Sequence, residues 1–84
     1  MSTAEQHVAI AAQMYECRAA ARRLLGAKYH ERMRDYATVV RAVAERDNCN
    51  DIVAGATVIK EAKLQGMEAL LLMAAIVEIT EPSN

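Results

Sequence analysis

The sequence lacks both a secretory signal and an apolar run long enough to cross a membrane. Its opening residues, MSTAEQHVAI, contain no basic segment followed by a long apolar stretch. The longest apolar run, Ala69 to Val77, is far shorter than the roughly 20 residues of a transmembrane helix. We therefore expect a soluble cytoplasmic protein without a membrane partner, in which Cys17 and Cys49 are reduced.

Motifs that indicate an enzyme are absent as well. The segment HERMR begins like the helix motif of zinc proteases, but Arg34 stands where the second histidine belongs. The two histidines and two cysteines lack the spacing of metal ligands, and there is no glycine-rich phosphate loop or nucleophile elbow. We therefore predict a protein that is not an enzyme, with no catalytic residues, no metal site and no cofactor.

Large aromatic side chains are scarce: the chain has no tryptophan, no phenylalanine and three tyrosines in 84 residues. Its apolar content is mainly aliphatic, and 54% of the chain is hydrophobic. Because the abundant alanine is the best helix former and lets helices approach closely, we predict a single all-α domain over residues 1–84. A chain this short has a thin margin of stability, which a second copy or a partner often supplements.

Glycine and proline are also rare, so the few signals for helix ends stand out. Two overlapping capping boxes, Ser2 with Glu5 or Thr3 with Gln6, predict a helix over about residues 3–25. Gly26 suits the left-handed position just past its end. The apolar seam of this helix is spaced by four and three residues in turn: Ile10, Met14, Cys17, Ala21 and Leu24.

A second seam with the same spacing predicts a helix over about residues 28–47: Tyr29, Met33, Tyr36, Val40 and Val43. The turn DNCND follows, and Asn50 or Asp51 can cap a third helix over about residues 51–64. Gly66 either ends that helix, so that a fourth spans about residues 67–80, or lies within one long helix. We favour the break at Gly66.

These elements predict a small antiparallel bundle of four short helices, or of three with a long last one. The segment ALLLMAAIV is apolar on every side. It is therefore either enclosed by the other helices or shared with another subunit. We expect only about 2–4 disordered residues at each end of the chain.

Positive charge is concentrated in one stretch, although the whole chain carries a net charge of −1. Residues 18–34 hold six basic residues and one acid, which makes +5, whereas the rest of the chain carries −6. A tyrosine and two arginines share a stripe on the first helix, and Gly26 lies beside the N–H groups of a helix amino terminus. We predict a site for a partner or ligand from these residues: Tyr15, Arg18, Arg22, Arg23, Gly26, Lys28, His30, Arg32 and Arg34.

An alternative interpretation is a solvated surface, on which these arginines pair with Glu31, Asp35 or acids of neighbouring helices. Binding to long nucleic acid duplexes is disfavoured, because the acidic remainder of the chain repels a polyanion.

The chain is short, helical and rich in alanine, lacks catalytic motifs and an export signal, and has its charge polarised into two parts. In these features it resembles the small helical accessory proteins that phages encode against host defences, including anti-CRISPR proteins. The resemblance is carried by the segments QMYECRAAARRLLGAKYHERM and GMEALLLMAAIVEITEPS. The resemblance implies inhibition by binding in the host cytoplasm, either to a defence complex or to a signalling molecule. A narrower likeness is to the helical phage sponges that sequester cyclic nucleotides with a tyrosine, a Gly-x-Lys and basic residues. It implies such parts for Tyr15, Gly26, Lys28 and Arg32.

Three functions follow as hypotheses. The first is an inhibitor whose basic face covers an acidic or nucleic-acid-binding surface of a host defence protein. The second is an oligomeric sponge for a cyclic oligonucleotide. The third is a structural homodimer or higher oligomer sealed by ALLLMAAIV.

Overall fold

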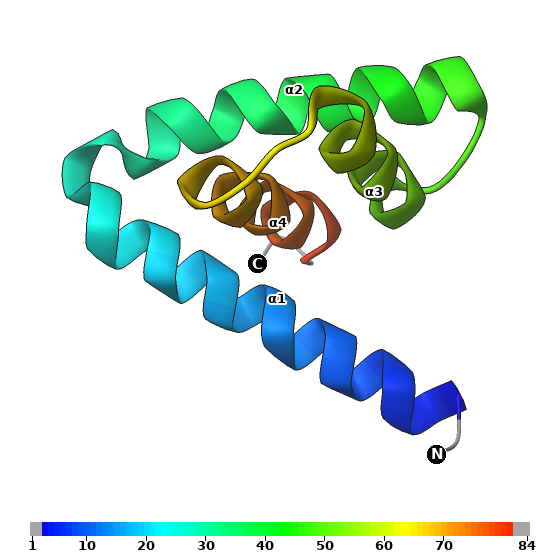
Figure 1. Ribbon diagram of the computed structural model, residues 1–84, viewed down its shortest axis with the longest axis horizontal. Coiled ribbons are helices and arrows are strands. Elements are labelled where there is room, and N and C mark those ends of the chain that lie inside the picture. The colour runs from blue at the N-terminus through cyan, green and yellow to red at the C-terminus, as the bar shows by residue number, and fades with distance from the viewer. Residues whose placement is uncertain (1–2, 82–84) are drawn as a thin grey trace.

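The computed structural model describes residues 3–81, apart from the side chains of residues 3–8 and 11 (Figure 1). The described residues form four α-helices and a short 3-10 turn, η1, so the all-α prediction is confirmed and α3 and α4 are separate helices. In chain order the elements are α1 (Thr3–Leu25), η1 (Gly26–Lys28), α2 (Tyr29–Asp47), α3 (Asp51–Ala62) and α4 (Met67–Thr80). Both predicted capping boxes and the expected disorder at the two ends lie outside what is described.

The first turn forms where the sequence predicts it. Gly26 follows the last residue of α1 and adopts a left-handed backbone with φ of 55°. Such a conformation is strained for residues that carry a Cβ atom. The turn η1 then leads directly into α2, which begins at Tyr29, a residue that is only 1% exposed.

The ends of α2 and α3 have the same structure: a residue with a left-handed backbone is followed by an apolar residue whose side chain packs against the core. Asn48 and Lys63 have φ of 51° and 54°. The next backbone N–H groups, of Cys49 and Leu64, donate to carbonyls five residues back. Both of these side chains pack against the core. This is the Schellman arrangement, in which the apolar contact fixes where the helix stops.

One predicted helix end is therefore wrong. Gly66 does not terminate α3; Lys63 does, because the chain must turn there to bring Leu64 onto the core. Gly66, with φ of 58°, is instead the residue that precedes α4. The predicted cap of α3 is confirmed, since the side-chain oxygen of Asn50 accepts a hydrogen bond from the N–H of Val53 at 2.8 Å.

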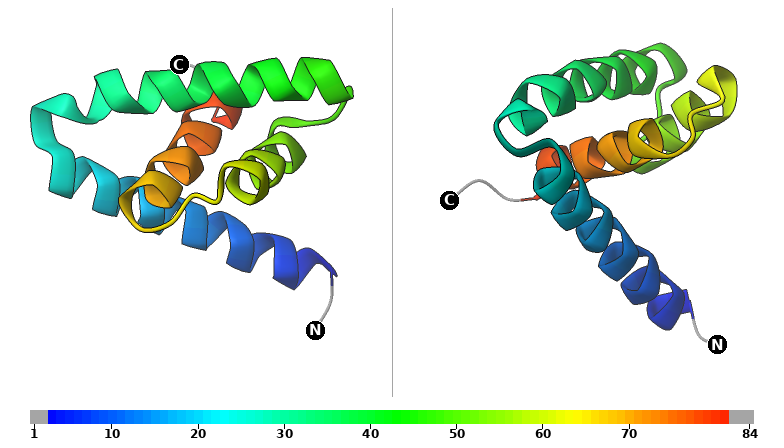
Figure 2. Two further views of the ribbon diagram at one scale, coloured as in Figure 1. Left: turned by 45° about the horizontal axis from the view of Figure 1, so that its top comes forward. Right: turned by 60° about the vertical axis from the view of Figure 1, so that its left-hand side comes forward.

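The helices are arranged around α4, which packs against each of the other three (Figures 1 and 2). The helices α1 and α2 run back on each other from the turn at Gly26, as the short loop predicts. They diverge from that corner, however, and touch each other little, because α4 lies between them. The predicted small helical bundle is therefore confirmed, and in this pair the two helices are held together through α4 rather than by direct contact.

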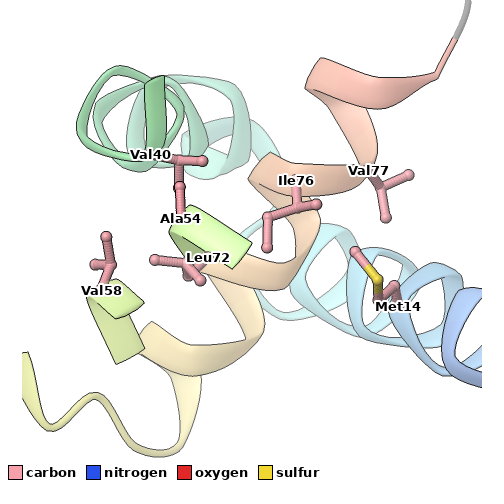
Figure 3. Packing of buried hydrophobic residues seen from close by; sticks show 7 residues of the cluster. All are labelled: Met14, Val40, Ala54, Val58, Leu72, Ile76 and Val77. Atoms are coloured by element: carbon pink, nitrogen blue, oxygen red, sulfur yellow. The ribbon is translucent and has the colours of Figure 1, made fainter. Parts of the chain in front are cut away.

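The apolar segment ALLLMAAIV is enclosed within the chain itself. Leu71, Leu72 and the residues from Ala74 to Val77 are all buried, and they meet residues of the other helices in the core (Figure 3). The choice left open by the sequence is therefore decided in favour of a core helix. This segment leaves no broad apolar face with which to seal an oligomer.

The two predicted seams differ in outcome. On α2, Tyr29 and Val40 are buried and the three residues between and after them are partly buried, as predicted. On α1 only the middle of the seam, at Met14 and Ala21, is buried. Its ends, Ile10 and Leu24, are 48% and 62% exposed. At its amino end, α1 extends beyond the shorter α4 (Figure 2). At its carboxyl end, Leu25 packs against the core in place of Leu24.

Candidate binding surface

The arginine stripe of α1 faces acids at the end of α4. Arg18 contacts both Glu78 and Glu81, and Arg22 donates to Glu78 at 2.7 Å. The guanidinium of Arg18 also lies over the ring of Tyr15, 4.9 Å from its centroid. These three predicted site residues are thus brought together, but two of them are already engaged within the chain.

Tyr29 joins the same cluster from α2. Its hydroxyl donates to Glu78 at 3.2 Å, and the guanidinium of Arg22 lies 5.3 Å from the centre of its ring. One carboxylate oxygen of Glu78 therefore accepts from two helices, α1 and α2. The cluster fastens α1 and α2 to the carboxyl end of α4.

Burial and the acids act in opposite directions on Arg18. Desolvation by itself lowers the pKa of its guanidinium, but the hydrogen bonds and charges of Glu81 and Glu78 outweigh that effect and the pKa is raised. Arg18 stays charged, and its side chain is only 15% exposed. A partner would have to displace these acids before it could reach the guanidinium.

Lys28, which directly precedes α2, and the basic residues of its first turns lie on two different flanks of that helix. Lys28 and Arg32, one turn apart, fall on one side of the buried seam, whereas His30 and Arg34, also one turn apart, fall on the other. Burial and, after it, Glu68 raise the pKa of the Tyr36 hydroxyl and Arg32 lowers it, so both charges lie close to this side chain. The first flank is therefore near the amino end of α4. All four side chains are exposed.

Arg23 and Gly26 complete the predicted set, and both are exposed at the corner between α1 and α2. Among the described residues, no ion pair joins an acid to any of the exposed bases of the segment beyond Arg22: Arg23, Lys28, His30, Arg32 and Arg34. These bases therefore remain available to a partner. We call them the corner bases.

The residues named by the sponge likeness do not converge within one chain. Tyr15 lies near Thr80, because both line the same hollow. Arg32 lies near Glu68, at the other end of α4. With a rise of about 1.5 Å per residue, roughly 18 Å of helix separates Glu68 from Thr80. A small nucleotide held by all four residues would need more than one copy of the chain.

Glu78 and Glu81 are the acids that pair with Arg18 and Arg22; the sequence analysis allowed for acids of neighbouring helices but did not name these two. It named Glu31 and Asp35 as local acids, but neither forms an ion pair among the described residues. One signal was available, because Glu78 directly follows the apolar run of α4 and so lies at the edge of the core. Its partners were not deducible without knowing that α1 packs on α4.

Three further observations concern Cys17, the residue types that bind metal ions, and the lengths of the helices. Burial, assisted by Glu16, raises the pKa of the Cys17 thiol, so this side chain is less reactive than a free cysteine. Within the described residues, no group of histidines, cysteines and acids is placed to hold a metal ion. In the same part of the chain, no helix has the length and apolarity needed to span a membrane.

No protein-family model matches this sequence, and neither a curated protein nor a solved structure matches the chain. The function is therefore argued from its own residues.

Proposed function

We propose that the protein is a non-enzymatic binding protein whose corner bases dock on an acidic, or nucleic-acid-binding, surface of another protein. The observation that supports the proposal is that Arg18 and Arg22 form ion pairs with Glu78 and Glu81, whereas the corner bases form none with the acids of the described residues. Arginines left unpaired on a surface are common anchors of protein interfaces.

The resemblance to phage accessory proteins suggests what such binding does. Covering the surface that a host defence complex uses for nucleic acid would inhibit it without any catalysis. The partner is thus a bacterial protein whose own function depends on that surface. Electrostatic docking of this kind accelerates association and weakens with salt.

A mutational test of the corner bases must leave the cluster around Glu78 intact. Reversing Arg22 would disturb the cluster around Glu78, so the informative variant carries Arg23→Glu with Arg32→Glu. Both positions are exposed and lie outside that cluster. Lys60→Glu with Lys63→Glu is a matched control, because it makes the same change of charge on the exposed end of α3.

The experiment is capture from bacterial lysate on immobilised protein, followed by identification by mass spectrometry. A specific partner should bind to wild type and to the control variant but not to the Arg23/Arg32 variant, and moderate salt should release it. If the Arg23/Arg32 variant captures the same proteins in the same amounts, the corner bases are not the docking site. Adding RNase and DNase to the lysate separates a protein partner from one carried in by nucleic acid.

A further inference from the structure

A hollow lined by apolar groups lies where α1, α3 and α4 meet, at the carboxyl end of α4. Its volume is about 150 Å³, and it is lined by Met14, Tyr15, Ile52, Val77 and Thr80. Met14 and Val77 are buried, whereas Tyr15 and Ile52 are 45% and 51% exposed. Since a water molecule takes about 30 Å³ in the liquid, the space suits one aliphatic side chain.

An acidic residue directly precedes or follows a lining residue in each of the three segments that form the hollow. Glu16 is adjacent to Tyr15, Asp51 to Ile52, and Glu81 to Thr80. The nearby Arg18 offsets part of this charge through its contacts with Glu81 and Glu78. The surroundings stay negative overall, so they favour an apolar group that is flanked by positive charge.

The chain itself presents such a group at its opposite side. Leu24 is the most exposed of the large apolar side chains in the described residues, at 62%, and it stands between the exposed bases Arg23 and Lys28. It follows Tyr15 by nine residues, or about 2.5 helical turns, and therefore points to the other side of α1. Leu24 cannot reach the hollow of its own chain.

We propose that copies of this protein associate head to tail, with Leu24 of one copy in the hollow of the next. Arg23 and Lys28 then face Glu16 and Asp51 of the neighbour. A two-fold contact between two hollows is disfavoured, because it brings the same acids against each other. The opposite charge of the two surfaces selects the unlike pairing, which can repeat along a row of copies.

One anchoring leucine covers far less area than the roughly 1,200–2,000 Å² of a stable interface, so the association is weak. It should become visible only at high protein concentration, and salt should reduce it because exposed charges are screened. The contact uses two of the corner bases, so a second copy and a protein partner compete for this surface. The inference does not otherwise depend on the proposed function.

Sedimentation and light scattering at low salt test the proposal with purified protein. The average mass should rise above the monomer value of 9.2 kDa as concentration approaches roughly millimolar, and should fall again in salt. Leu24→Asp and Ile52→Asp should each stay monomeric. Val39→Asp and Val53→Asp are matched controls at 44% and 50% exposure, outside the hollow and the leucine, and should associate like wild type.

A mixing experiment identifies the pairing. Leu24→Asp keeps an intact hollow and Ile52→Asp keeps an intact leucine, so an equimolar mixture should form pairs that grow no further. Circular dichroism verifies folding, and Leu24→Ala and Ile52→Ala serve if an aspartate variant is unfolded. A wild-type protein that stays monomeric, a Leu24 variant that associates normally, or a mixture that forms no pairs would each overturn the proposal.

Discussion

Gly55 is buried in α3, against side chains of α4. A Cβ atom added there would lie 2.2 Å from Cδ1 and 3.0 Å from Cγ1 of Ile76, which is itself 2% exposed. The glycine therefore leaves the room that the buried side chain of Ile76 occupies. Glycine is a poor helix former, but at this position its lack of a Cβ atom allows the close contact with Ile76.

Gly55→Ala should lower the free energy of unfolding. Overpacking typically costs about 1–3 kcal/mol, and the better helix propensity of alanine returns up to about 1 kcal/mol. Urea denaturation followed by circular dichroism measures the difference. Combining the change with Ile76→Val, which removes the obstructing Cδ1 atom, should recover part of the loss; strict additivity of the two effects would contradict the clash.

Two tyrosines on the inner face of α2 make the fold sensitive to alkali. Burial, followed by the charge of Glu78, raises the pKa of Tyr29 above its ordinary value of 10.0. Burial and Glu68 raise that of Tyr36 in the same direction, against a smaller effect of Arg32. The folded state thus favours the protonated phenols more strongly than the unfolded state does.

Stability should therefore be complete below about pH 10 and decline as pH rises through the folded pKa values of the two tyrosines. The measurement is the urea midpoint at a series of alkaline pH values. Tyr29→Phe should flatten the decline in part, and addition of Tyr36→Phe should flatten it further. An unchanged slope in the double variant would assign the decline to other groups.

At the scale of the elements, the ends of α2 and α3 show how a core contact fixes a boundary. Neither end has a glycine at its left-handed residue, and at α3 the residue is Lys63. Its left-handed backbone is unfavourable for a side chain that carries a Cβ atom. The inward turn of Leu64 compensates for this strain.

Lys63→Gly should therefore stabilise the protein, by up to about 1 kcal/mol. Lys60→Gly, inside the same helix, should instead destabilise it by about the same amount, since glycine is a poor helix former. Thermal unfolding of the two variants separates these effects. A destabilised Lys63→Gly variant would mean that the lysine side chain itself contributes to the helix end.

At the scale of the whole molecule, α1 depends on α4 for its place. It has little contact with α2, so the packing around Met14 and Ala21 and the cluster at Glu78 hold it. Glu78 is the shared acceptor of that cluster, and its side chain is 25% exposed. Loss of its charge removes the ion-pair partner of Arg22 and weakens the acceptor of the Tyr29 hydroxyl, whereas Arg18 keeps its contact with Glu81.

Glu78→Gln should reduce stability by about 1–3 kcal/mol, as expected when a hydrogen-bonded charge is removed. The amides of α1 should lose more hydrogen-exchange protection than those of α2 and α3. Glu61→Gln is the control, because the contact of Glu61 with Arg46 is exposed on both sides and such pairs contribute about 0–1 kcal/mol. Equal loss of protection in all helices would contradict a specific tether for α1.

Much of the fold was predictable because it depends on short-range rules. Periodic apolar residues placed α2, and Gly26, Asn50 and the polar turn after Asp47 marked ends that the structure confirms. The exposed ends of the α1 seam were not predictable, since they depend on how α4 lies along α1 and on the packing of Leu25, rather than Leu24, against the core. The end of α3 depends likewise on a contact between Leu64 and residues distant in sequence.

The candidate site, too, was predictable only in the features that depend on residue type. The sequence by itself determined that the molecule is helical and that its positive charge lies between residues 18 and 34, because propensity and charge are properties of residue types. Only the tertiary structure decided which of those charges remain available. Packing α1 across α4 brought Glu78 and Glu81 to Arg18 and Arg22, pairs more than fifty residues apart, and left the corner bases facing solvent.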